Sequence, residues 1–185
     1  METCVRDRQI LPTGHRPPRP IPALDYETEA RHHRERGKLL LEMGRYREAL
    51  AQFRQALTVH PHDAESWSSR ADALACLGLY DDALQSLEQA QELAGLADPR
   101  FWVQKAVLFI LLNQPEAALT CCNQALWRSP SHRQAWLFRS VALHRLGQFQ
   151  AAYRSYQRVS QPGLSSPAES IRQLCHDLAP HHQAS

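Results

Sequence analysis

Residues 30–63 of this chain read ARHHRERGKLLLEMGRYREALAQFRQALTVHPHD, and this 34-residue pattern recurs in three further copies that begin at Ala64, Pro99 and Arg133. Each copy contains two stretches of about a dozen residues whose apolar side chains recur at i, i+3, i+4 and i+7, with a short turn between them. A period of this length predicts stacked helical hairpins, because one hairpin cannot bury its apolar face alone.

The recurring residues explain how the two helices of a copy would pack. Small residues at positions 8 and 20 allow two helix backbones to approach closely, and a bulky side chain at position 4 or 24 fills the space between neighbouring hairpins. Position 15 suits a left-handed helix C-cap, which glycine adopts most easily and asparagine next. Position 8 holds Gly37, Ala71, Ala106 and Ser140, position 15 holds Gly44, Gly78, Asn113 and Gly147, and position 20 holds Ala49, Ala83, Ala118 and Ala152.

This pattern resembles the tetratricopeptide repeat family, with repeats at 30–63, 64–97, 99–132 and 133–166. The resemblance implies an all-α fold, a right-handed α-solenoid of stacked antiparallel helix hairpins. Helices are expected near residues 26–43, 47–59, 64–77, 81–94, 99–112, 116–128, 133–146 and 150–160. The family binds many unrelated partners on one scaffold, so the resemblance does not identify the partner.

The segments outside the repeats have a different composition. Residues 1–24 contain prolines with arginines between them, which predicts a disordered tail, and the repeat domain is expected over 25–179. Ser166 to Glu169 has capping-box spacing and predicts a helix near 167–178. Its apolar face, Ile171, Leu174, Cys175 and Leu178, would cover the last hairpin, and residues 180–185 should fray.

Composition narrows the class of function. The formal net charge of +2 is carried by the first 24 residues, so the repeats are neutral and nucleic-acid binding is disfavoured. Five scattered cysteines, mostly at core-type positions, predict a reduced, cytoplasmic protein. No apolar run resembles a signal peptide, and the apolar stretch 101–112 is too short to span a bilayer.

No motif in the sequence indicates catalysis. There is no phosphate loop, nucleophile elbow or zinc-protease helix, so we expect no enzymatic activity and no cofactor. His32 and His33 point in different directions on a helix, and His60 and His62 have no further ligands at recognisable spacing, so we expect no metal site. Cys121 and Cys122 look like a redox pair, but Cys122 occupies position 24, the core slot.

In the family that the sequence resembles, ligands lie in a concave groove lined by the first helix of each repeat. Mapped onto this chain, the groove is polar in repeats 1 and 2 and apolar in repeats 3 and 4. The predicted partner-binding residues are Arg34, Lys38, Ser69, Asp72, Arg100, Val103, Gln104, Val107, Ile110, Leu111, Leu137, Phe138, Val141, His144 and Arg145.

The apolar half of the groove has three interpretations. A soluble monomer seldom exposes so large an apolar patch, so it could bind a partner's peptide or amphipathic helix, form a homodimer, or be covered by the chain's own tail or C-terminal helix. The first is preferred, which predicts an adaptor or assembly factor. On that interpretation Phe138→Ala spares the fold, whereas Trp136→Ala, at a core position, destabilises it. Binding of an acidic surface or nucleic acid through the basic tail is the least favoured function.

Two charged features allow further comparison. Some family members clamp a chaperone's C-terminal carboxylate, but only Arg34 and Arg100 match the five residues involved, so that activity is not carried over.

Position 7 is basic in every repeat. This ladder could contact an acidic partner, but pairing with acids of the same hairpin is preferred. Its members are Arg36, Arg70, Lys105 and Arg139.

Overall fold

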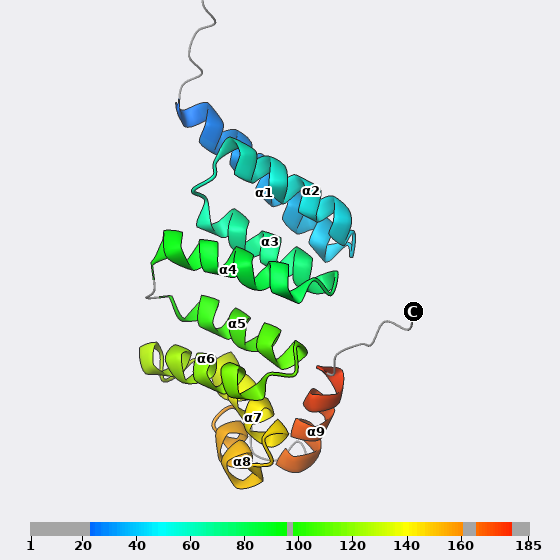
Figure 1. Cartoon of the computed structure of the whole chain (residues 1–185), viewed down its shortest axis with the longest axis vertical. Coiled ribbons are helices and arrows are strands. Elements are labelled where there is room, and N and C mark those ends of the chain that lie inside the picture. The colour runs from blue at the N-terminus through cyan, green and yellow to red at the C-terminus, as the bar shows by residue number, and fades with distance from the viewer. Residues whose placement is uncertain (1–22, 96–97, 161–165, 179–185) are drawn as a thin grey trace, which may run out of the picture.

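The computed structural model describes residues 23–95, 98–160 and 166–178, and all regular structure within them is helical. Figure 1 shows the helices stacked as antiparallel pairs along the long axis of the molecule, from α1 and α2 at one end to α7 and α8 at the other. The predicted all-α solenoid is therefore confirmed. The helices are α1 (Ala23–Glu42), α2 (Tyr46–Val59), α3 (Ala64–Cys76), α4 (Tyr80–Ala94), α5 (Pro99–Leu111), α6 (Pro115–Arg128), α7 (Arg133–Arg145), α8 (Phe149–Gln157) and α9 (Pro167–Asp177).

The first helix begins earlier than expected. α1 starts at Ala23, two residues inside the segment predicted to be a tail. Pro22 is the last proline before it, so every residue of α1 has the N–H that a helix needs. The rest of the predicted disordered tail, residues 1–22, and the predicted frayed C-terminus, residues 180–185, lie outside the described residues.

Packing within the first hairpin shows why position 8 must be small. Phe53 of α2 is fully buried, and its ring lies over Gly37 of α1. A Cβ at Gly37 would lie 2.5–2.9 Å from three atoms of that ring. The alanines at position 20 are likewise fully buried, which confirms their role at the helix crossings; they are Ala49, Ala83, Ala118 and Ala152.

The turns between paired helices also follow the sequence. The residue at position 15 of each repeat has a positive φ, 76° at Gly78 and 56° at Asn113. Side chains rarely tolerate this conformation, and asparagine is the residue best suited to replace glycine there.

The junction between repeats 2 and 3 differs from the others. The indole nitrogens of Trp67 and Trp136 each donate a 2.8 Å hydrogen bond to the carbonyl of a proline six residues earlier. At the corresponding Trp102, the indole nitrogen is buried and has no hydrogen-bond partner. Asp98 caps α5 by accepting a 2.9 Å hydrogen bond from the backbone N–H of Arg100.

The core has one large cluster and several smaller ones. Repeats 1 and 2 share a continuous cluster that extends onto α5 through Phe101 and Leu108. Repeats 3 and 4 contain smaller clusters, and α9 completes two of them with Ile171 and Leu174. The predicted capping helix is present as α9; on its apolar face Ile171 is buried, and Leu174, Cys175 and Leu178 are partly buried.

Candidate partner-binding groove

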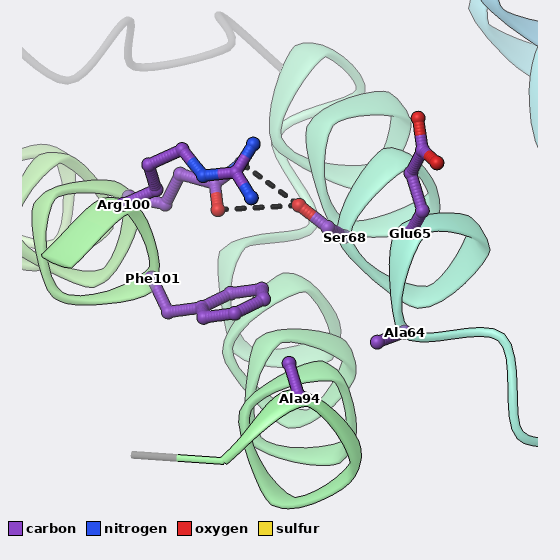
Figure 2. A pocket seen from close by; sticks show the side chains of 7 residues that line it. Ala64, Glu65, Ser68, Ala94, Arg100 and Phe101 are labelled. Carbon is purple, nitrogen blue, oxygen red and sulfur yellow. Dashed lines mark hydrogen bonds between the residues drawn. The ribbon is translucent and has the colours of Figure 1, made fainter. Parts of the chain in front are cut away.

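Two hollows lie between α3 and α5, the first helices of repeats 2 and 3. The larger hollow, of about 350 Å³, lies between the N-terminal ends of these two helices (Figure 2). The smaller, of about 150 Å³, lies toward their C-terminal ends. Both are open to solvent and both are lined by Gln104. This part of the surface, between α1, α3 and α5, is called the first half of the groove below.

The larger hollow combines an aromatic wall with polar groups. Figure 2 shows the Phe101 ring reaching from α5 toward Ala94, with Ser68 of α3 facing the α5 side chains. The Ser68 hydroxyl donates to the Gln104 carbonyl oxygen at 3.2 Å, and the Gln104 amide donates to Asp72 at 3.1 Å. Gln104 is therefore held between the two hollows.

Ion pairs connect α1 to α3 along the first half of the groove. Arg34 contacts Asp63 at 2.5 Å and Glu65 at 3.3 Å, and Lys38 contacts Glu65 at 2.5 Å. The Arg34 and Asp63 side chains are only 15% and 12% exposed. Arg34 and Lys38, both predicted to contact a partner, thus have intramolecular partners. Arg100 is exposed and pairs with the cap residue Asp98 at 2.7 Å.

The remaining predicted residues of the first half differ in accessibility. Ser69 is 7% exposed and belongs to the interior. Val107 is half-buried and lines the smaller hollow together with Asp72, which is accessible to solvent. Partial burial raises the pKa of the Asp72 carboxyl group, an effect that the hydrogen bond from Gln104 opposes.

The second half of the groove is closed between α5 and α7, although Leu137 lines two open hollows beside α8 and α9, of about 280 and 600 Å³. The structure corrects the prediction for Val103, Ile110 and Val141, which are 5%, 0% and 0% exposed and do not line an open surface. Leu174, Cys175 and Leu178 of α9 pack against the cluster that contains Ile110 and Val141. Residues of the C-terminal helix therefore cover groove positions that were predicted to contact a partner. Leu111 and Leu137 are half-buried.

Phe138 is the clearest departure from the sequence-based interpretation. Its ring packs against three separate clusters, which contain Val103, Ile110 and Cys122 respectively. It therefore joins the hairpins of repeats 3 and 4 to each other, and the expectation that Phe138→Ala spares the fold does not follow from this position.

Arg145 and His144 also serve the interior. The Arg145 guanidinium donates to the carbonyl of Ile110 in α5 and to those of Cys175 and Leu178 at the end of α9, the last at 2.7 Å. His144 Nδ1 lies 3.5 Å from Cys175 Sγ, and burial lowers the pKa of its imidazole. Both residues, predicted to contact a partner, instead hold α9 against α7.

Three of the four basic residues at position 7 donate hydrogen bonds to polar side chains on the second helices of the hairpins. Arg70 and Arg139 each donate a 2.5 Å hydrogen bond to a serine hydroxyl sixteen residues later, Ser86 and Ser155. Lys105 donates to the Gln91 side chain at 2.8 Å. Arg70 and Arg139 thus bond within their own hairpins, whereas Lys105 bonds to α4 of the preceding hairpin, where Glu88 also lies 3.9 Å from it. The partners of these three residues are mainly hydroxyl and amide groups instead of the expected acids of the same hairpin.

Other chemistries have little support in the described residues. No group of three histidine, cysteine, aspartate or glutamate side chains gathers there in a way that could hold a metal ion. Burial raises the pKa of Cys121 to about 11 and that of Cys122 to about 12, so neither thiol forms the reactive thiolate at neutral pH. None of the helices in the described ranges has the length and apolar character needed to cross a membrane.

Comparisons with known proteins agree with this architecture. A family model described as tetratricopeptide repeat matches residues 34–98 and 103–164. Superkiller protein 3 of Schizosaccharomyces pombe is 30% identical over 98 residues, which are 51% of this chain and 7% of that protein. The chain thus spans a small fraction of the length of this relative.

Two solved structures share the fold at low sequence identity. The structure of YrrB, described as a TPR protein with an unusual peptide-binding site, has a TM-score of 0.62 and 18% identity, and the match covers 86% of this chain and 92% of that one. The TPR2B domain of yeast Sti1, in complex with pHsp70, has a TM-score of 0.54 and 22% identity, over 69% of this chain and 98% of that one. At these identities the likeness shows the fold alone.

Proposed function

We propose that this chain, which belongs to the tetratricopeptide repeat family, is a non-enzymatic adaptor or assembly factor. In this proposal it binds a partner's peptide or amphipathic helix in the first half of its groove. Proteins of this family typically act as scaffolds for protein interactions. The observation that carries the proposal is the pair of open hollows between α3 and α5.

These hollows have the character of a peptide site. Each combines apolar side chains with a few polar groups, and peptide-binding surfaces use the former for affinity and the latter for orientation. YrrB and the Sti1 domain have the same fold, and their descriptions name a peptide-binding site and a complex with pHsp70. This supports the class of function, and the partner here remains to be identified.

Site-specific crosslinking tests the proposal. A photo-reactive amino acid is placed in the full-length chain at Glu65, on the rim of the larger hollow, or at Gln89, an exposed residue of α4. In extract from the native cell, we expect a protein that crosslinks from Glu65 and not from Gln89. A partner captured equally from both positions, or only from Gln89, would contradict groove binding.

No observation favours the homodimer. It depended on an apolar stripe in repeats 3 and 4, and Val103, Ile110 and Val141 of that stripe are buried within the chain. We expect light scattering after size-exclusion chromatography to give the mass of a monomer.

Binding through the basic tail would depend on residues outside the described part. The free thiols of the described cysteines support our proposal of a reducing compartment such as the cytoplasm.

A further inference from the structure

The two carboxylates that line the hollows between α3 and α5 have different surroundings. Glu65 lies within 4.0 Å of both Arg34 and Lys38. No lysine, arginine or histidine of the described residues lies within that distance of Asp72, whose side chain accepts a hydrogen bond only from Gln104. The smaller hollow is therefore bordered by a carboxylate without a counter-ion.

Asp72 is positioned to gain from a cation. Its side chain is exposed beside the hollow, and burial raises the pKa of its carboxyl group. Burial and then the charge of Asp72 raise the pKa of Cys76, one turn further along α3. An opposite charge close to a partly desolvated carboxylate is favoured, because the local dielectric constant is lower than that of water.

The walls of the smaller hollow suit the stem of a long basic side chain. Leu87 and Leu108 are 1% and 3% exposed. Ala71 and Ala75 have small side chains and leave the space above α3 free. Lysine and arginine bury their methylene groups along apolar surface while the charged end remains near polar groups. The apolar lining consists of Ala71, Ala75, Leu87, Val107 and Leu108.

We propose that the hollow of about 150 Å³ between α3 and α5 binds a lysine or arginine side chain of the partner segment, with Asp72 as its counter-ion. This inference rests on the proposed function, because it assigns the chemistry of a ligand to that groove. A neutral aliphatic side chain would cover the walls but leave Asp72 unpaired, and an acidic side chain would be repelled. The site therefore selects for positive charge at one position of the partner.

Titration of the ¹⁵N-labelled full-length chain with small probes tests the site. The probes are the N-acetyl N-methylamides of lysine, norleucine and glutamate, of which norleucine has an uncharged stem of similar length. We expect lysine to shift amide resonances of α3 and α5 around Asp72 and to bind about five-fold tighter than norleucine, with glutamate weakest. Equal binding of lysine and norleucine, or shifts confined to other helices, would overturn the proposal.

Substitution identifies the carboxylate. Asp72→Asn keeps the shape and the acceptor for Gln104, and it should reduce lysine binding to the level of norleucine. Asp81→Asn, which removes an exposed acid of α4, is the matched control and should leave the lysine preference unchanged. An undiminished preference in Asp72→Asn would assign the charge selection to another group and overturn the proposal.

Two further outcomes separate this inference from its alternatives. If a partner crosslinked from Glu65 binds the Asp72→Asn chain as tightly as the original chain, the groove function stands and the proposed cation site is wrong.

The arginines of residues 1–22 are an alternative occupant of the hollow beside Asp72. If replacing Arg6, Arg8, Arg16 and Arg19 by glutamine shifts the resonances around Asp72, the chain's own tail occupies the site, and the assignment to a partner is overturned.

Discussion

The two halves of the groove are built from the same repeat but differ in accessibility. Val107 and Val141 occupy the same position of successive repeats, yet Val107 lines an open hollow and Val141 is 0% exposed. The difference arises from α9, which packs against the second half and has no counterpart against the first among the described residues. An apolar groove position beside the end of a solenoid is therefore a core position when a capping helix turns back onto it.

The largest expected effect that tests this comparison is at Phe138. The Phe138 ring is partly buried but joins three clusters of the closed half, so Phe138→Ala should lower the free energy of unfolding by about 3 kcal/mol, the lower limit for loss of a fully buried phenylalanine. Urea unfolding followed by circular dichroism measures it. A loss below about 1 kcal/mol, the range of ordinary surface changes, would restore Phe138 to an open groove.

The next effect concerns the attachment of α9. Arg145→Met keeps most of the stem but removes the donors to the carbonyls of Ile110, Cys175 and Leu178, so it should cost about 2 kcal/mol. Hydrogen exchange should accelerate in α9 more than in α1 or α2. Uniform acceleration along the chain would mean that α9 does not open separately from the repeats.

A matched pair of valines measures the difference between the halves directly. Val141→Ala should cost about 1.5 kcal/mol, since two methyl groups leave a fully packed site, whereas Val107→Ala should cost less than about 1 kcal/mol. The comparison requires only the midpoints and slopes of two urea titrations. Equal costs for the two variants would mean that the hollow beside Val107 is closed in solution.

The smallest expected effect is a pH dependence in the first half. Burial raises the pKa of Asp63, but hydrogen bonds from Ser66 and Arg34, and the charge of Arg34, outweigh it and leave the pKa below its ordinary value. A lowered folded-state pKa stabilises the protein above the unfolded pKa of about 3.9, and this stability is lost as pH falls further.

Asp63→Asn should therefore cost about 1 kcal/mol at pH 7 and less at pH 3. Unfolding titrations at both values provide the measurement, with Asp81→Asn as the exposed control. A cost that is the same at both pH values would show that the carboxylate charge of Asp63 contributes no stability.

Much of the fold follows from local features of the sequence. The period of 34 residues predicts the helix pairs. The size of side chain allowed at a given repeat position is set by contacts with residues close to it in the sequence. Gly37 must be small because Phe53 lies over it, and Asn113 turns a helix end as glycine does elsewhere. The small residue at position 8 and the positive φ at position 15 recur in every repeat, so a single sequence with internal repeats reveals these requirements.

The candidate site was predicted less completely. Sequence reasoning placed Asp72, Gln104 and Val107 in the groove, where the structure has them at one hollow. It did not anticipate that Arg34 and Lys38 would be paired with acids of α3, because position on a helix does not say which neighbouring side chain lies opposite.

The amino-acid sequence by itself determined the repeat, the pairing of helices, the turns and the existence of an apolar helix at the C-terminus. Only the tertiary structure decided which half of the groove stays open, because that depends on contacts between residues far apart in the chain. Arg145 bonds both to Ile110 in α5 and to the last carbonyls of α9, across 35 and 33 residues. Helical periodicity specifies which face of α9 is apolar, but the surface that this face covers is selected by packing and hydrogen bonding across the whole stack.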